Sequence, residues 1–272
     1  MPTSVNEVVE KAEMLEINPA VGAAALKSTG KDPSSETEAQ LLDNELEKKM
    51  EGESKDISSK KVGENEKEEQ TKEDVPVEVE AKTGVSFPVV LDDAKQLTAV
   101  GLRKKSMLGL GIKIYAFGIY ADNDKLKDLL KAKFVKAPAK ATKEMYQMII
   151  DSDVAMVVRM VIVFNGLTIS MVKKNFDEGL GASIKKLTGT KNEKLTKKIM
   201  GEASDDIKLT PGSVIEISRL PGYKLQAKVK DEIVSTVENE LLCRAYIYMY
   251  LGEDPFDKEA KEKFGASLLS LF

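Results

Sequence analysis

Residues 97–120 read LTAVGLRKKSMLGLGIKIYAFGIY, and this stretch decides the fold more clearly than any other part of the chain. Both of its halves are rich in apolar, β-branched and aromatic residues, while Gly109 and Gly111 interrupt the pattern between them. Two such runs around a short Gly-containing connection are typical of a β-hairpin. We therefore predict strands over 97–106 and 112–122, joined by a turn at these glycines.

The hairpin brings two polar side chains together. If it is centred on Gly109, Arg103 and Tyr115 lie opposite each other, because each is six positions from the centre. Their side chains then share a face with Phe117 and Ile119. A guanidinium and a phenol above apolar neighbours can hold a buried carboxylate, since both are donors. Spacing alone leaves two alternatives open: an idle pair on an exposed face, or a one-residue slip that separates the two.

Strand and helix patterns continue to the C-terminus. Alternation and apolar runs predict further strands over 154–164, 214–218 and 223–229. Apolar residues at helical spacing and capping signals predict helices over 124–134, from Ser170 onward, around Leu195 after a Thr190–Glu193 capping box, through Leu241 after a Ser235–Glu238 capping box, and after Asp254 and Pro255. Strands and helices that come in adjacent groups indicate an α+β fold, with an antiparallel sheet covered by helices.

The N-terminal part has a different composition. Residues 31–82 consist almost entirely of Glu, Lys, Ser, Asp and Thr, so they offer little apolar surface to bury. We predict two parts: an acidic, mostly disordered extension over 1–80 and one folded domain over 81–272.

Several absences exclude whole classes of function. The chain has no histidine and a single cysteine, Cys243, so it cannot form a catalytic triad with histidine, an imidazole metal site or an internal disulfide. The glycines at 109 and 111 lack the third glycine of a dinucleotide motif. The net charge of -4 argues against nucleic acid as a partner, and no apolar run is long enough to span a membrane. We expect no metal and no cofactor; protein partners are not readable.

The same stretch resembles the opening hairpin of the chalcone isomerase family. Three other features fit this family: the segment from Glu240-Leu-Leu-Cys-Arg to Leu251-Gly-Glu-Asp-Pro-Phe, the spacing of Val172 and Phe176, and Pro211-Gly-Ser. The Gly-Leu-Arg-Lys-Lys-Ser and Tyr-Ala-Phe-Gly runs are most similar to the plant plastid fatty-acid-binding branch. The resemblance covers about residues 81–272 and implies an open-faced β-sandwich, in which a layer of helices covers an antiparallel sheet.

The resemblance also implies a site. In that branch an Arg and a Tyr at the positions of Arg103 and Tyr115 hold the carboxylate of a free fatty acid, and the acyl chain lies in an apolar pocket. Val172 and Gly179 stand where true isomerases have a catalytic tyrosine and a pocket asparagine, so they are candidates for lining that pocket. Neither side chain can donate a hydrogen bond.

The implied function is therefore non-catalytic fatty-acid binding in support of fatty-acid metabolism or storage. Two alternatives remain: a chalcone-flavanone isomerase, which is an intramolecular lyase, and a non-catalytic partner protein of a biosynthetic enzyme. Relatives in this branch are placed in the chloroplast stroma, and we expect the same location here. However, Glu7 and Glu10 are unlike a transit peptide, so the cytoplasm is the alternative.

Overall fold

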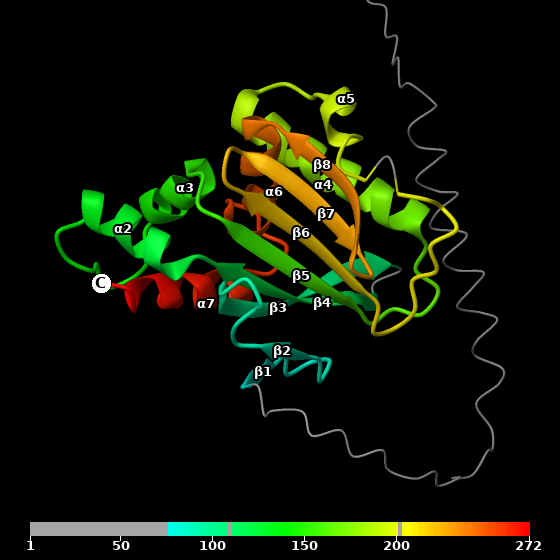
Figure 1. Ribbon diagram of the computed structural model, residues 1–272, viewed down its shortest axis with the longest axis horizontal. Helices are drawn as coiled ribbons and strands as arrows, with labels where there is room; N and C mark the ends of the chain where they lie inside the picture. The colour runs from blue at the N-terminus through cyan, green and yellow to red at the C-terminus, as the bar shows by residue number, and fades with distance from the viewer. Residues whose placement is uncertain (1–75, 108–109, 201–202) are drawn as a thin grey trace, which may run out of the picture. The chain divides into compact units, whose positions relative to one another are not determined.

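Residues 76–107, 110–200 and 203–272 are described by a computed structural model (Figure 1). The main strands are β3 (Gln96–Met107), β4 (Leu110–Ala121), β5 (Met156–Ile162), β6 (Val214–Leu220), β7 (Lys224–Val229) and β8 (Glu232–Glu238). They form one antiparallel sheet whose spatial order follows the chain from β3 to β8. Because β3 and β8 lie at opposite edges, the sheet is open.

A layer of helices covers one face of this sheet (Figure 1). The helices are α2 (Asn123–Lys133), α3 (Lys143–Asp151), α4 (Ile169–Thr188), α5 (Glu193–Thr196), α6 (Glu240–Leu251) and α7 (Lys258–Leu269). α6 packs against α3, α4 and α7, and α7 also packs along β3. Buried apolar residues of the sheet and of these helices form one continuous core. The predicted α+β architecture is therefore confirmed.

The opposite face of the sheet is covered only in part. Strands β1 (Val77–Val79) and β2 (Ser86–Pro88) form a small separate sheet, and Phe87 of β2 packs on Val100 and Ala116. A Cβ on Gly118 would lie only 2.9 Å from the Phe87 ring, so this close packing requires glycine there. The folded part thus begins ahead of the predicted boundary at residue 81. The rest of the predicted extension, residues 1–75, lies outside the described residues.

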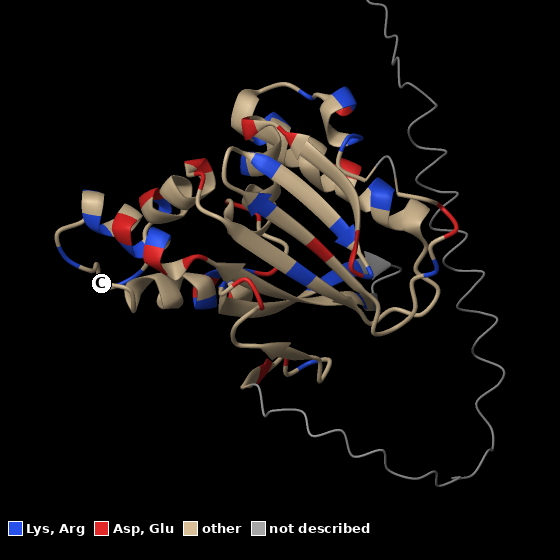
Figure 2. Ribbon diagram, in the orientation of Figure 1, with Lys and Arg blue, Asp and Glu red and all other residues tan. Residues whose placement is uncertain are grey.

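Elsewhere this second face is charged. Arg159 on β5 lies 3.5 Å from Glu216 on β6, which in turn lies 4.0 Å from Lys228 on β7. Figure 2 shows this row of alternating charge crossing the middle strands. The Arg159 and Lys228 side chains are 31% and 35% exposed and that of Glu216 is 16% exposed, so water reaches this row in part. Ion pairs that water reaches add little to stability.

One predicted helix start is wrong. Ser235 and Glu238 lie in strand β8, and Asn239 caps α6 instead. The β-branched residues on both sides of Ser235 favour a strand. Lys230 and Asp231 have φ angles of 50° and 69°, which is the backbone of a two-residue turn joining β7 to β8.

Two other helix starts are shifted, and four elements were not predicted, namely strands β1, β2 and β8 and helix α3. Asn192 caps α5 in place of Thr190, and Asp257 caps α7 in place of Asp254 and Pro255. In both cases the side-chain oxygen that accepts the first-turn amides lies closer to the helix than we predicted. Strands β1 and β2 are too short for a periodic pattern, and no pattern predicted α3. No helix in the described part of the chain is long and apolar enough to cross a membrane.

Candidate functional site

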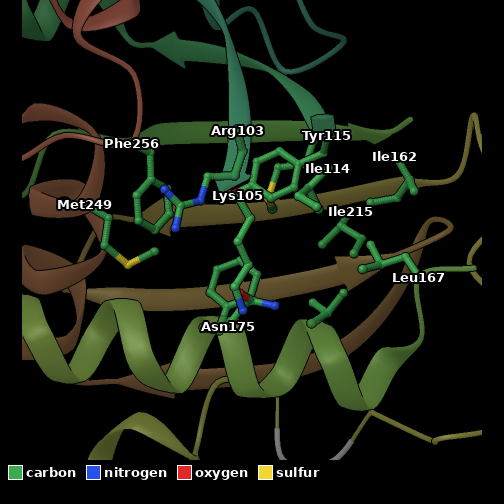
Figure 3. Close-up of a pocket in the computed structure, with 13 residues that line it drawn as sticks. Arg103, Lys105, Ile114, Tyr115, Ile162, Leu167, Asn175, Ile215, Met249 and Phe256 are labelled. Atoms are coloured by element: carbon green, nitrogen blue, oxygen red, sulfur yellow. The ribbon is translucent and has the colours of Figure 1, made fainter. Parts of the chain in front are cut away.

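An apolar cavity lies between the helix-covered face of the sheet and α4 (Figure 3). It is lined by Arg103, Lys105, Ile114, Tyr115, Met160, Ile162, Leu167, Val172, Asn175, Phe176, Ile215, Met249 and Phe256. The lining contains two cations and no carboxylate. Its free space is about 30 Å³, room for roughly two water molecules.

Arg103, Lys105 and Tyr115 lie on the hairpin of β3 and β4. The centre of this hairpin is half a residue away from the predicted centre at Gly109. Met107 pairs with Leu110, which puts the centre between positions 108 and 109. The turn residues Leu108 and Gly109 themselves lie outside the described residues. Continued without change, this register would set Arg103 opposite position 114 and not opposite position 115.

A β-bulge restores the predicted pair. The register shifts between Arg103 and Lys104, so that β4 contributes one extra residue, Ile114, and Arg103 pairs with Tyr115. A bulge of this kind re-aims side chains, and here both Ile114 and Tyr115 line the cavity. The predicted pairing is therefore confirmed, although the reasoning from hairpin symmetry did not contain the bulge that produces it.

Arg103 is half-buried in this cavity and lacks an anionic partner. Its guanidinium carbon lies 3.7 Å from the centroid of the Phe256 ring, a cation–π contact. Figure 3 shows the guanidinium pointing toward Phe256. With the described residues it makes no hydrogen bond and no ion pair. A guanidinium carries five N–H donors, so its capacity to bind an anion is unused.

Tyr115 supplies a neutral donor beside this cation. Burial raises the pKa of its hydroxyl, and the Arg103 charge and the Tyr250 hydroxyl offset only part of that rise. The phenol is therefore protonated at neutral pH and can donate a hydrogen bond. Its ring meets the Phe117 ring edge to face, with centroids 6.3 Å apart, which fixes its direction.

Behind the cavity the aromatic packing continues into α6. The Tyr250 ring contacts those of Phe117, Phe256 and Tyr246 edge to face, at centroid distances of 5.1 to 5.6 Å. The Tyr250 hydroxyl lies 3.8 Å from Met160 Sδ, and the buried Tyr246 hydroxyl has no hydrogen-bond partner among the described residues. The Tyr250 ring is therefore held by three neighbouring rings.

The two candidate pocket residues on α4 differ in position. Val172 lines the cavity. Gly179 lies beside it: a Cβ there would come 3.1 Å from both Met249 Cε and Phe256 Cζ. Gly179 thus leaves room for two side chains that do line the cavity, and its own contact with a ligand stays a prediction.

Sequence reasoning missed several lining residues that simple spacing indicates. Lys105 is two positions after Arg103 on the same strand, and Asn175 is three positions after Val172 on one helix. Phe256 had no such signal, because it lies in the connection between α6 and α7. Among the residues of known placement, no group of three or more acidic, Cys or His side chains is arranged to hold a metal ion.

Comparison with known proteins gives consistent matches. Residues 77–264 match the family model described as chalcone isomerase-like. Chalcone isomerase-like protein 1 of Humulus lupulus is 58% identical over 199 residues, which is 72% of this chain and 93% of that protein. Fatty-acid-binding protein 1 of Arabidopsis thaliana is 39% identical over 197 residues, 71% of each chain. A crystal structure of the Arabidopsis fatty-acid-binding protein 1 superposes with a TM-score of 0.68 and 38% identity, covering 72% of this chain and 98% of that one.

Proposed function

The chain belongs to the chalcone isomerase-like family, and from this premise we propose that it binds a free fatty acid. Arg103 and Tyr115 hold the carboxylate, and the acyl chain lies along the apolar lining of the cavity. Two relatives are named fatty-acid-binding proteins. The observation that carries the proposal is the Arg103 guanidinium, which faces an apolar cavity and has no acidic side chain of the described residues beside it.

Binding must open the cavity, because about 30 Å³ of free space cannot hold an acyl chain. The side chain that we expect to move is Phe256, whose ring covers Arg103 and which lies between α6 and α7. The exchange is favourable: a cation–π contact is worth about 0.5–2 kcal/mol, while each hydrogen bond to a charged group contributes about 1.5–3 kcal/mol. Burying a chain of a dozen CH₂ groups adds roughly 9 kcal/mol before the costs of ordering.

We also propose that the protein does not catalyse a reaction. Val172 and Gly179 stand at the positions of the polar pocket residues of true isomerases, and neither can transfer a proton. The alternative activity, closure of a chalcone to a flavanone, consumes the absorbance of the chalcone. We expect that absorbance to stay constant when the protein is added; a decay dependent on protein concentration would contradict this part of the proposal.

The binding proposal is tested by mass spectrometry of lipids that co-purify with the full chain, followed by titration with dodecanoate. We expect free fatty acids in the wild type and strongly reduced loading in Arg103→Ala. Arg159→Ala is the matched control, because Arg159 lies on the opposite face of the sheet in an ion pair with Glu216. Empty wild-type protein that also fails to bind dodecanoate, or equal loading of both variants, would overturn the proposal.

In the cell we propose a role in fatty-acid metabolism or storage within the chloroplast stroma, as the resemblance to the fatty-acid-binding branch implies. Imaging of the full-length protein with a fluorescent tag at its C-terminus tests the location. Signal confined to plastids is the expected result, and signal spread through the cytoplasm would contradict it.

A further inference from the structure

We propose that the preferred ligand of this cavity is an oxygenated acyl chain, with a hydroxyl near its middle that binds between Lys105 and Asn175. This inference rests on the proposed function, because the carboxylate end is the one held by Arg103 and Tyr115. The hydroxyl is a second polar contact of the ligand, and it defines the class of fatty acid that we expect to bind.

Lys105 is the first half of this second contact. It is two residues after Arg103 on β3, so strand alternation puts both side chains on the cavity side, and both line the cavity. Lys105 is half-buried, yet it makes no hydrogen bond or ion pair with any residue of known placement. Figure 3 shows it running across the cavity toward Asn175 of α4, away from the direction of the Arg103 guanidinium. The charged ends of Arg103 and Lys105 therefore lie in separate parts of the cavity.

Asn175 is the second half. Its side-chain Nδ2 donates to the backbone oxygen of Met171 at 2.8 Å, which fixes the amide so that Oδ1 is the atom left for a ligand. Within the described ranges nothing donates to that oxygen. The cavity thus offers a donor, Lys105 Nζ, and an acceptor, Asn175 Oδ1, in the same area.

A hydroxyl is the group that matches such a pair, because it accepts from the ammonium and donates to the amide oxygen. A methylene satisfies neither polar atom, and burying both without a partner is costly. A second carboxylate only accepts, so it would lie against the amide oxygen unfavourably. Same-face neighbours on a strand are about 6.6 Å apart, so the hydroxyl belongs several carbons from the carboxylate and not next to it.

The test compares dodecanoate, 6-hydroxydodecanoate and 12-hydroxydodecanoate by isothermal titration of the full chain. Two hydrogen bonds in a partly buried site predict that the 6-hydroxy acid binds about tenfold more tightly than dodecanoate. The 12-hydroxy acid should show no such gain, because its hydroxyl lies at the far end of the chain among apolar residues.

Variants then assign the gain to these side chains. In Lys105→Met and in Asn175→Leu the ratio of the two affinities should fall to about one. Lys104→Met is the matched control, since Lys104 is the exposed neighbour on the other face, and it should keep the tenfold ratio. Thermal unfolding of each variant confirms that it is folded.

Each outcome separates the two proposals. Equal affinity of the wild type for dodecanoate and 6-hydroxydodecanoate, or a preference that survives Lys105→Met, overturns this inference and leaves fatty-acid binding intact. A wild type that binds none of the three acids overturns the proposed function, and this inference with it.

Discussion

Two arginines of the same sheet, Arg219 on β6 and Arg103 on β3, are held in opposite ways. Arg219 is fully buried, with an exposed fraction of 0%. Its guanidinium donates to the backbone oxygens of Val154, Ile149 and Ile150 at 2.8, 3.1 and 3.2 Å. Arg103 is half-buried and donates to none of the described residues. Both cations are therefore at least half-buried. They differ in how many of their N–H donors make hydrogen bonds to the protein.

The difference follows from what each guanidinium meets. Ile149 and Ile150 belong to the last turn of α3, where backbone carbonyls lack helical partners and a positive charge is favourable. Arg219 also reaches the Ser152 hydroxyl at 3.3 Å. Burial lowers its pKa from 12.5 to about 10, so it is still charged at neutral pH. An arginine whose N–H donors are hydrogen-bonded to the protein stabilises the fold. An arginine in a cavity whose donors are unused is available to a ligand.

The largest expected effect is on the free energy of unfolding, and it comes from replacing Arg219. Arg219→Met removes the hydrogen bonds to three backbone carbonyl oxygens, two of them buried, and we expect the free energy of unfolding to fall by about 4 kcal/mol. Urea denaturation followed by circular dichroism measures this change. A loss below about 1 kcal/mol would mean that water replaces the guanidinium at little cost, and the contrast between the two arginines would weaken.

The converse change should affect binding and leave stability nearly intact. Arg103→Met removes a charge that makes no hydrogen bond or ion pair with the described residues and loses only the cation–π contact with Phe256, so we expect the free energy of unfolding to change by less than about 1 kcal/mol. The affinity for dodecanoate should fall about 30-fold, because hydrogen bonds from a charged group are lost. The two variants should therefore have opposite effects: Arg219→Met lowers stability, and Arg103→Met lowers affinity. If Arg103→Met instead destabilises the fold as much as Arg219→Met does, Arg103 is structural.

Sequence patterns predicted one of these arginines and not the other. Arg103 lies in a clear hairpin, where counting from a turn gives its partner, and the family resemblance then gives it a role. The importance of Arg219 depends on the end of α3, which the patterns did not predict. The carbonyls that it caps are about 70 positions away in the chain. Local periodicity contains no information about such a contact.

The same limit explains the rest of the cavity. The β-bulge that pairs Arg103 with Tyr115 is one residue in length, below what an alternating pattern resolves. Phe256 enters the cavity from a connection between two helices. Neither the helical nor the strand spacing of apolar residues therefore predicts its position. Strands β3 to β7 and most helices were predictable because their apolar faces repeat. Strand β8 was not predicted, and neither were these details of the cavity, since they depend on tertiary packing.

A smaller effect is expected at the neutral partner of Arg103. Tyr115→Phe removes one uncharged donor, so the affinity for dodecanoate should fall about fivefold with the free energy of unfolding unchanged. Because burial raises the pKa of the Tyr115 hydroxyl, it remains a donor as the pH rises, and the wild-type affinity should be constant between about pH 7 and pH 9. A loss as large as that of Arg103→Met would assign the carboxylate mainly to the tyrosine.

The smallest expected change concerns Cys243, which is buried on α6 near Arg219. Burial raises the pKa of its thiol from 9.0 to about 12, and the positive charge of Arg219 offsets only part of that rise. The thiol is therefore protonated and shielded, and iodoacetamide at about pH 8 should not label the folded wild type, since the thiolate is the reactive form. The raised pKa also means that the contribution of Cys243 to stability is present below about pH 9 and is lost as the pH rises toward 12.

Labelling of Cys243 then reports on the two arginines independently of any ligand. Since modification requires opening of the fold, its rate should rise in Arg219→Met and stay at the wild-type level in Arg103→Met. Mass spectrometry of the intact chain over time measures both rates. Rapid labelling of the wild type would show that the α6 core opens without unfolding. Equal acceleration in both variants would show that Arg103 supports the same core as Arg219, which its unused donors argue against.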